Sequence, residues 1–537
     1  MTDGRRAALA DVFLAVAAVA VPLASSSATV DQYTTVKWYV LHALAALWLI
    51  EEVWIQKTAR WPAFVREHRV AVVGLVVLAV WSAFRAGAAP AMAPLADRAA
   101  CAILVLCAAW TFERGPAAVR ALVAGLAISV TATIALGLAQ AGGVTLPAAL
   151  VAREGPAALF GNVNMAAQFV GLALVLVIGV PLEPGQRSAT AWNALRALLA
   201  AGGALYLYIL ASRSVLVALA ACAVVLAYRR RPSLAFVAVP VAVAALLVWH
   251  PWPPRDPDLA AHKAASVEMR LSLWADTLAM IGERPLGVGA ANFEDAFLPY
   301  QARGRLEPQE ALVFRSPHNE YLRYLAEDGI PFTAVAVALL AILLWRWRSA
   351  PARSPALDVV VAGWGTFLAV EAAFQFPLAL AFGALAAALT VGAAVASVER
   401  EEPRPGHHAW WRVGGTLAGL MLVAATSRIA WSEVLNVRGP DDLESQRHAC
   451  ALDARNFPAC VTAAWLEVRE GDAGAATTRL GEVLAHAPHY PPALKLLGET
   501  AHLQGDEAEA CRRLGAYDAL FRGRSSVHAA AVEACAR

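Results

Sequence analysis

The sequence predicts an all-α membrane protein whose helices cross the bilayer about thirteen times. Of its 537 residues, 59% are hydrophobic and only 16% are charged. Soluble domains carry roughly a quarter charged residues. The apolar residues form long runs until the chain turns polar near Val437, and basic residues recur in every second connection between these runs. Most of the chain must therefore lie in lipid.

The apolar runs have the length of membrane-spanning helices, because a hydrocarbon core of about 30 Å needs roughly 17 to 25 residues. The first run follows Arg5 and Arg6 and also fits a signal peptide, with a cleavage site between Ala24 and Ala28. Cleavage there would leave the downstream orientation unchanged. The approximate spans are 7–25, 38–55, 70–88, 97–112, 121–140, 164–182, 195–212, 214–228, 233–250, 320–345, 356–374, 378–398 and 413–432.

The alternation of basic residues predicts the orientation, because cytoplasmic loops accumulate Lys and Arg. With the N-terminus inside, the outer connections hold few basic residues, chiefly Lys37, Arg85, Arg98 and Arg153. An odd number of spans then puts the C-terminus on the outer side of the membrane. The predicted inner connections carry Lys57, Arg60, Arg66, Arg69, Arg114, Arg120, Arg187, Arg196, Arg229, Arg230, Arg231, Arg346, Arg348, Arg353, Arg400, Arg404 and Arg412.

One connection is long and lies on the predicted outer side, from about 251 to 318. Its apolar residues recur at helical spacing, which predicts an ordered helical cap rather than a structureless loop. They are Met269, Leu273, Trp274, Leu278 and Ile281. We therefore divide the chain into a transmembrane domain, 1–436, that contains this loop, and a C-terminal domain on the outer side, 437–537.

The C-terminal domain repeats itself with a period of about 34 residues, which is typical of tetratricopeptide helix hairpins. Gly471-Asp472 and Gly505-Asp506 are the predicted turns between paired helices. The repeats either complete the structure or form a platform for an acceptor or a partner protein. Four cysteines lie here, and Cys450–Cys460 and Cys511–Cys535 are candidate disulfides among three possible pairings.

Three residues on the predicted outer side are candidates for chemistry. Arg213 lies at a tight turn between two spans, Arg270 lies in the long loop, and His318 lies where that loop re-enters the membrane. Each also has a structural alternative: an interfacial arginine, a surface ion pair and a helix-capping histidine. Together they suit transfer of a group from a diphosphate, because arginines bind phosphate oxygens and a histidine can remove a hydroxyl proton. This scheme needs no metal and no cofactor.

Several segments resemble the O-antigen ligase and polymerase superfamily, in the order in which that family has them. They are Phe160 to Met165 (FGNVNM), Ala211 to Ser214 (ASRS), Glu283 to Phe293 (ERPLGVGAANF), Ser316 to Leu322 (SPHNEYL) and Leu325 to Pro331 (LAEDGIP).

The resemblance implies a metal-independent glycosyltransferase of GT-C type with an undecaprenyl-diphosphate-linked glycan as donor. It assigns donor diphosphate binding to Arg213 and Arg270 and the catalytic base to His318. Arg315, Asn319, Arg303 and Arg305 are secondary candidates for phosphate or glycan contacts.

The sequence does not determine the acceptor of the glycan. The interpretation that we favour is an O-antigen ligase that acts on lipid A core. A protein O-oligosaccharyltransferase or a polymerase of the same superfamily is the alternative, since the external repeats suit a protein partner. A transporter or a non-catalytic scaffold explains the candidate residues less well. The net charge of only +2 gives no reason to expect a nucleic-acid partner.

Overall fold

The computed structural model describes residues 3–29, 31–55, 63–85, 92–147, 155–181, 189–230, 257–304, 310, 313–350, 354–398 and 408–536. Every regular element in these ranges is a helix, which confirms the predicted all-α class. Seven of the described helices are long and apolar enough to cross a membrane, and three shorter apolar helices accompany them. The chain is thus a multi-pass membrane protein.

The predicted spans that fall within the described ranges are helical. Their bounds are α1 (Asp3–Leu23), α2 (Thr35–Ile55), α4 (Arg69–Phe84), α5 (Met92–Glu113), α6 (Ala117–Ala141), α7 (Val163–Gly179), α8 (Ala189–Leu210), α9 (Arg213–Arg230), α14 (Gly329–Ser349), α15 (Pro355–Val359) continued by η2 (Val360–Trp364) and α16 (Gly365–Phe374), α17 (Ala381–Val398) and α18 (His408–Arg438), with the short α3 (Ala63–Glu67) before α4. The predicted ninth span, 233–250, lies outside the described residues.

Small residues allow the membrane helices to pack closely. The central helix α17 is almost completely buried and packs along α5, where a Cβ on Gly392 would lie 2.6 Å from Ala108 Cβ. Likewise, a Cβ on Gly125 of α6 would lie 2.5 Å from the Ala15 carbonyl oxygen of α1. Close contact of this kind holds helices together in lipid, where the hydrophobic effect does not drive their association.

The prediction of one continuous span over 320–345 is wrong. The structure has two helices here, α13 (Glu320–Glu327) and α14 (Gly329–Ser349). The helix is interrupted because Gly329 has a φ of +87°, in the left-handed region that glycine adopts without a steric cost. The break separates α13, which carries the polar residues of the segment, from the apolar helix α14.

The described part of the long loop is helical, as predicted. It contains α11 (Pro257–Glu283) and α12 (Phe293–Arg303). Leu273 and Met280 of α11 form a small apolar core with Phe293 and Phe297 of α12. This core is separate from that of the membrane helices, so the loop is a packed unit of its own.

Six helices follow α18 and form antiparallel neighbours: α19 (Leu443–Leu452), α20 (Phe457–Arg469), α21 (Ala473–His486), α22 (Pro491–Leu503), α23 (Glu507–Leu520) and α24 (His528–Ala536). The two predicted Gly-Asp turns are present. Gly471 and Gly505 have φ values of +89° and +77°, and Asp472 and Asp506 cap the next helices by accepting backbone hydrogen bonds. The tetratricopeptide assignment and the domain division stay predictions.

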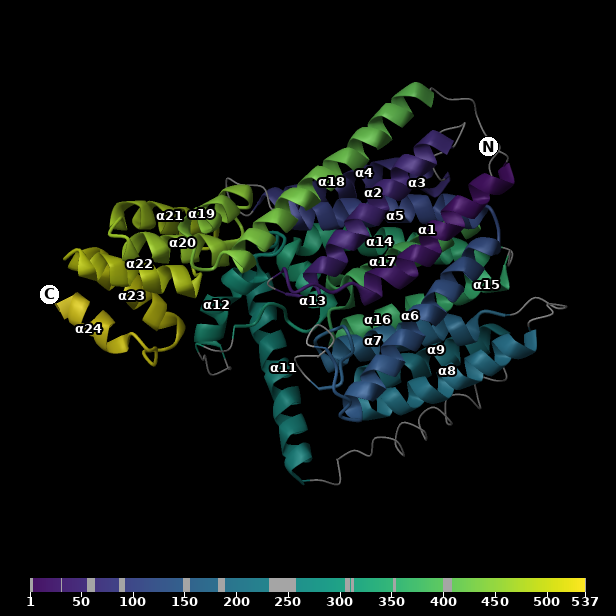
Figure 1. The fold of residues 1–537 in the computed structure, drawn as a ribbon, viewed down its shortest axis with the longest axis horizontal. Helices are drawn as coiled ribbons and strands as arrows, with labels where there is room; N and C mark the ends of the chain where they lie inside the picture. Colours follow the sequence, from purple (N-terminus) through teal and green to yellow (C-terminus); the bar gives the residue numbers. More distant parts are fainter. Residues whose placement is uncertain are drawn as a thin grey trace.

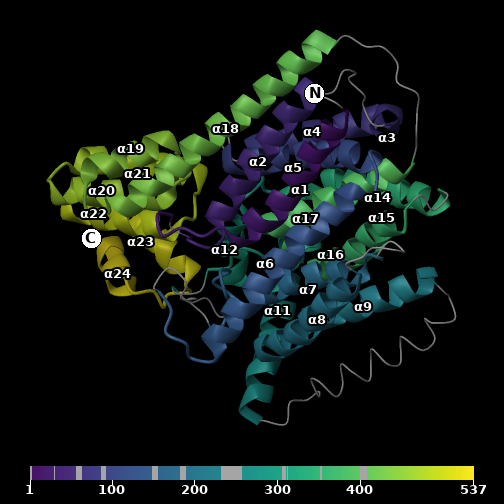
Figure 2. The same cartoon turned by 45° about the vertical axis from the view of Figure 1, so that its right-hand side comes forward.

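The C-terminal helices lie against α12 of the long loop (Figures 1 and 2). Leu298 of α12 belongs to their apolar core. The backbone N–H of His489 donates to the Asp295 carboxylate over 2.7 Å, and the Arg522 guanidinium donates to the Ala302 carbonyl over 2.6 Å. These contacts join the end of the chain to the loop that carries Arg270.

Both candidate disulfides are present in the structure. Cys450–Cys460 links α19 to α20, and Cys511–Cys535 links α23 to α24, with Cα atoms 4.9 Å and 4.7 Å apart.

Replacing all four cysteines by Ser should therefore lower the free energy of unfolding of these helices by about 2–4 kcal/mol per bridge. Thermal unfolding with and without a thiol reductant measures this. The reductant should lower the melting temperature of the wild-type protein only, and equal sensitivity of the four-Ser variant would contradict the prediction.

Candidate functional site

His318 is held in place by its chain neighbours at the start of α13. The Asn319 side chain caps the helix by accepting from the Leu322 backbone N–H over 3.1 Å. On the other side, the Trp274 indole of α11 donates to the Pro317 carbonyl over 2.8 Å. His318 itself has a φ of +50°, a conformation that is uncommon for non-glycine residues and is found at many functional sites.

The imidazole of His318 lies between α11 and the end of α16. Its ring is 5.4 Å from the Phe376 ring, it interacts with the Gln375 amide, and Nδ1 is buried without a hydrogen-bond partner. Burial lowers the pKa of His318, and the positive charge of Arg270 lowers it further. At neutral pH the ring is therefore neutral and can accept a proton.

Three hydrogen bonds attach the start of α13 to the end of α16 and the turn after it. The Asn319 amide donates to the Ala373 carbonyl over 3.1 Å, and the Tyr321 hydroxyl donates to the Ala369 carbonyl over 2.8 Å. The Leu378 backbone N–H donates to the Glu320 carboxylate over 3.2 Å. Among the secondary candidates, Asn319 thus holds the start of α13, next to His318, against α16.

A carboxylate that sequence reasoning missed lies at the same place. Glu371 of α16 is fully buried, accepts from the Ser214 hydroxyl over 3.3 Å and interacts with Gln168 of α7 and with the charge of Arg270. It thus joins α7 and α9 to the loop. An acidic residue within an apolar span is uncommon and usually functional, and this signal could have revealed Glu371 from the sequence.

The structure therefore brings Arg270 and His318 together, with Arg213 next to the Ser214 that contacts Glu371. Burial lowers the pKa of Arg270, whereas the nearby Glu371 charge opposes that shift. Three residues that were not predicted also lie at this candidate site: Gln168, Glu371 and Gln375.

The remaining candidates have other partners. Arg303 is 3.6 Å from the Glu283 carboxylate and lies over the Tyr300 ring. Arg315 is exposed and lies 3.5 Å from Glu294. Arg305 lies outside the described residues.

Two chain segments interlock and fix α11 relative to α13; we call them the clasp. They are 285–290, which follows α11, and 326–330, which contains the end of α13 and the start of α14. The Val288 and Gly289 backbone N–H groups donate to the Ala326 and Glu327 carbonyls, each over 2.8 Å. In return, the Ile330 N–H donates to the Pro285 carbonyl over 2.9 Å. Both segments belong to the motifs quoted above.

Glycine is required where the two segments of the clasp cross. Gly287 and Gly329 have φ values of +81° and +87°. A Cβ on Gly329 would lie 2.4 Å from the backbone carbon of Leu286, and one on Gly287 would lie 2.4 Å from the Glu327 oxygen. No side chain fits between backbones this close.

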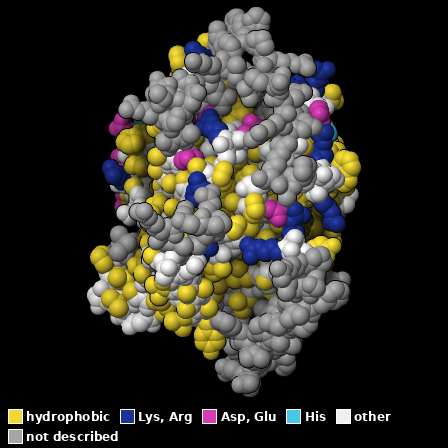
Figure 3. All heavy atoms as spheres, turned by 90° about the vertical axis from the view of Figure 1, so that its right-hand side faces the viewer, with side chains coloured by type: hydrophobic (Ala, Val, Ile, Leu, Met, Phe, Trp, Pro, Cys, Tyr) yellow, Lys and Arg dark blue, Asp and Glu magenta, His cyan; other side chains and the backbone are white. Residues whose placement is uncertain are grey.

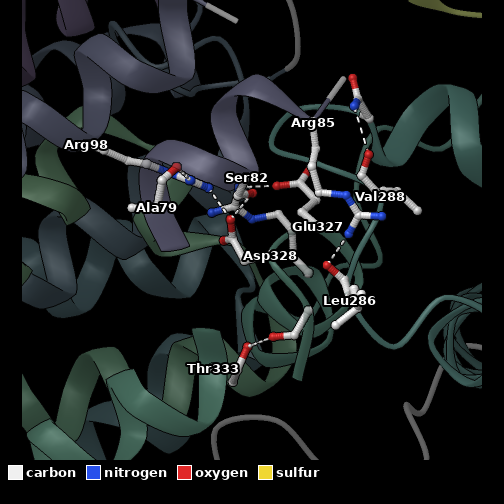
Figure 4. Close-up of polar contacts among 12 residues, drawn as sticks. Ala79, Ser82, Arg85, Arg98, Leu286, Val288, Glu327, Asp328 and Thr333 are labelled. Carbon is white, nitrogen blue, oxygen red and sulfur yellow. Dashed lines mark hydrogen bonds and ion pairs between the residues drawn. The ribbon is translucent and has the colours of Figure 1, made fainter. Parts of the chain in front are cut away.

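Polar side chains attach the clasp to the membrane helices (Figure 4). The buried Asp328 carboxylate pairs with Arg98 of α5 and accepts from the Ser82 hydroxyl of α4. The Arg85 guanidinium donates to the Leu286 carbonyl. The clasp therefore fixes Arg270 and His318 relative to the bundle as well as to each other.

Residues 197–335 match the family model described as O-antigen ligase. The chain therefore contains an O-antigen ligase-family domain. The matched segment extends from α8 into α14 and includes Arg213, Arg270, His318 and both segments of the clasp. No curated protein matches the chain.

Substitution of a clasp glycine should disable the ligase-family domain. Gly329→Ala forces a Cβ into the Leu286 backbone and costs about 1–2 kcal/mol for the left-handed conformation alone. We expect a lower melting temperature in detergent and loss of glycan transfer. Gly282→Ala is the matched control, because a Cβ there has nothing within 4 Å. Equal effects of the two substitutions would contradict the role of the clasp.

Proposed function

We propose that the protein transfers a glycan from an undecaprenyl-diphosphate donor to an acceptor hydroxyl at the periplasmic face. The observation that carries this proposal is the partly buried, neutral His318 beside Arg270, held by the clasp within the ligase-family domain. A proton acceptor next to a fixed cation suits attack by a hydroxyl with a diphosphate leaving group.

The chemistry follows from these charges. An unprotonated imidazole nitrogen of His318 takes the proton of the acceptor hydroxyl as that oxygen attacks the anomeric carbon of the donor. The bond between this carbon and the diphosphate oxygen breaks, and undecaprenyl diphosphate leaves with the electron pair. Arg270 and Arg213 stabilise the negative charge that develops on the diphosphate. The step uses no metal in this proposal.

The orientation is part of the proposal. The C-terminal helices and the long loop lie at one end of the molecule (Figure 1), and the two disulfides there suit an oxidising compartment such as the periplasm. The opposite end carries several groups of Lys and Arg side chains among hydrophobic and acidic ones (Figure 3), which is compatible with a cytoplasmic face. The inner membrane is then the location that fits both observations.

For the acceptor, we propose lipid A core, which makes the protein an O-antigen ligase. One observation favours a protein acceptor as a second candidate: the C-terminal helices contact α12 of the loop that carries Arg270. A platform at that position would hold a bound partner near the site. Reconstitution with a lipid-linked glycan and each acceptor in EDTA decides between them. A strict metal requirement would contradict the proposed chemistry.

His318→Ala and Arg270→Ala should each abolish transfer, with a loss of at least about 100-fold, because the first removes the proton acceptor and the second the fixed cation. The measurement is product formation in proteoliposomes at matched protein levels. His448→Ala and Arg284→Ala are matched controls, since both side chains are exposed. Normal transfer by His318→Ala would exclude His318 as the base.

The rate of transfer should depend on pH through His318. Because the pKa of His318 is lowered in the folded protein, the neutral base persists at mildly acidic pH, and the rate falls only as the pH drops through that lowered pKa. In Arg270→Gln a neighbouring positive charge is lost, so the pKa of His318 should rise. Site-resolved acylation of His318, followed against pH in the wild-type protein and in Arg270→Gln, measures the titration midpoint of His318 in each. A lower midpoint in the variant than in the wild type would contradict the placement of Arg270 beside His318.

A further inference from the structure

A charged cavity lies between α7, α8, α9 and α15. It is on the predicted cytoplasmic side, where α7 and α9 end, away from the C-terminal helices (Figure 1). Its volume is about 290 Å³. Three arginines line it, Arg196, Arg229 and Arg230, together with the single carboxylate of Asp358. The described lining therefore has an excess of positive charge.

The arginines are held in place by the protein. Arg229 donates to Asp358 over 2.7 Å through Nε and lies 4.3 Å from the centre of the Trp347 ring. Arg230 donates to the Gly179 carbonyl over 2.9 Å, and Arg196 donates to the Val180 carbonyl. The Nε of Arg196 is buried and has no hydrogen-bond partner. A buried guanidinium N–H without an acceptor is costly, and an anionic ligand would provide one.

An apolar groove continues from this cavity along the membrane helices. Its volume is about 360 Å³, and it is lined by side chains of α7, α8 and α9, such as Leu174, Ala204 and Leu219. Ile178, Gly179 and Leu226 line both the cavity and the groove. A cationic cavity that opens into an apolar groove between membrane helices is complementary to an amphiphile, which has an anionic head and a hydrocarbon tail.

We propose that this cavity binds the phosphate headgroup of an anionic phospholipid from the cytoplasmic leaflet, with one acyl chain in the groove. Basic cavities between membrane helices on the cytoplasmic side recognise such headgroups. The charge excess selects an anionic over a zwitterionic lipid, and the groove selects a lipid over free phosphate. The site lies at the opposite ends of α8 and α9 from Arg213, so it is separate from the transfer site.

The test is native mass spectrometry and thermal unfolding of the full chain in detergent, with phosphatidylglycerol or phosphatidylcholine added. Phosphatidylglycerol should remain bound and raise the melting temperature, whereas phosphatidylcholine should do neither. Arg196→Gln combined with Arg230→Gln should weaken phosphatidylglycerol binding roughly tenfold or more. Arg348→Gln, an exposed basic residue at the end of α14, is the matched control and should bind normally.

A groove variant and a competition experiment identify the class of ligand. Ala204→Trp should fill the groove and weaken binding while the arginines remain, and inorganic phosphate should not compete. Competition by inorganic phosphate, preference for a polyprenyl phosphate, or unchanged binding in both the Arg and the Trp variants would each overturn the phospholipid assignment. Equal retention of phosphatidylcholine would also overturn it.

Discussion

The site depends on the clasp between the segments 285–290 and 326–330. Three backbone hydrogen bonds join the segments, and the glycines at their crossing leave no room for a side chain. Each such bond contributes only about 0.5–1.5 kcal/mol, so their effect lies mainly in geometry. They fix the end of α11 against the end of α13, and thereby Arg270 against His318. A second contact acts with the clasp, because the Trp274 indole of α11 donates to the Pro317 carbonyl, next to His318.

The clasp works because the membrane bundle supports it. Asp328 is buried and paired with Arg98, and the bundle beneath is closely packed through small residues such as Gly392 and Gly125. A buried ion pair adds little net stability, but removal of one partner is costly, so the pair specifies where the clasp lies. Glu371 plays a comparable part on the other side, where it joins α7, α9 and Arg270. The site is thus assembled from elements far apart in the chain.

The two proposed sites lie at opposite ends of the protein, and they suit different ligands. At the end with the disulfides, His318, Arg270 and Arg213 form the proposed site for a diphosphate and a hydroxyl. At the other end, arginines held by backbone carbonyls line a cavity that continues into an apolar groove. In both places cations are fixed before a ligand arrives, which reduces the entropy that binding must overcome.

The sequence by itself determined the all-α class, the helical spans, the helical loop and the Gly-Asp turns, because hydrophobic runs, helical spacing and turn chemistry are local properties. It also indicated His318 and Arg270. Only the tertiary structure decided the break before α14, since Gly329 alone does not reveal that another backbone crosses there. The same holds for Gln168 and Gln375, which lie at the candidate site through packing between helices distant in the chain. Glu371 stands out in the sequence as an acidic residue in an apolar span, but its partners do not. Local patterns cannot encode such contacts, because they depend on which helices become neighbours.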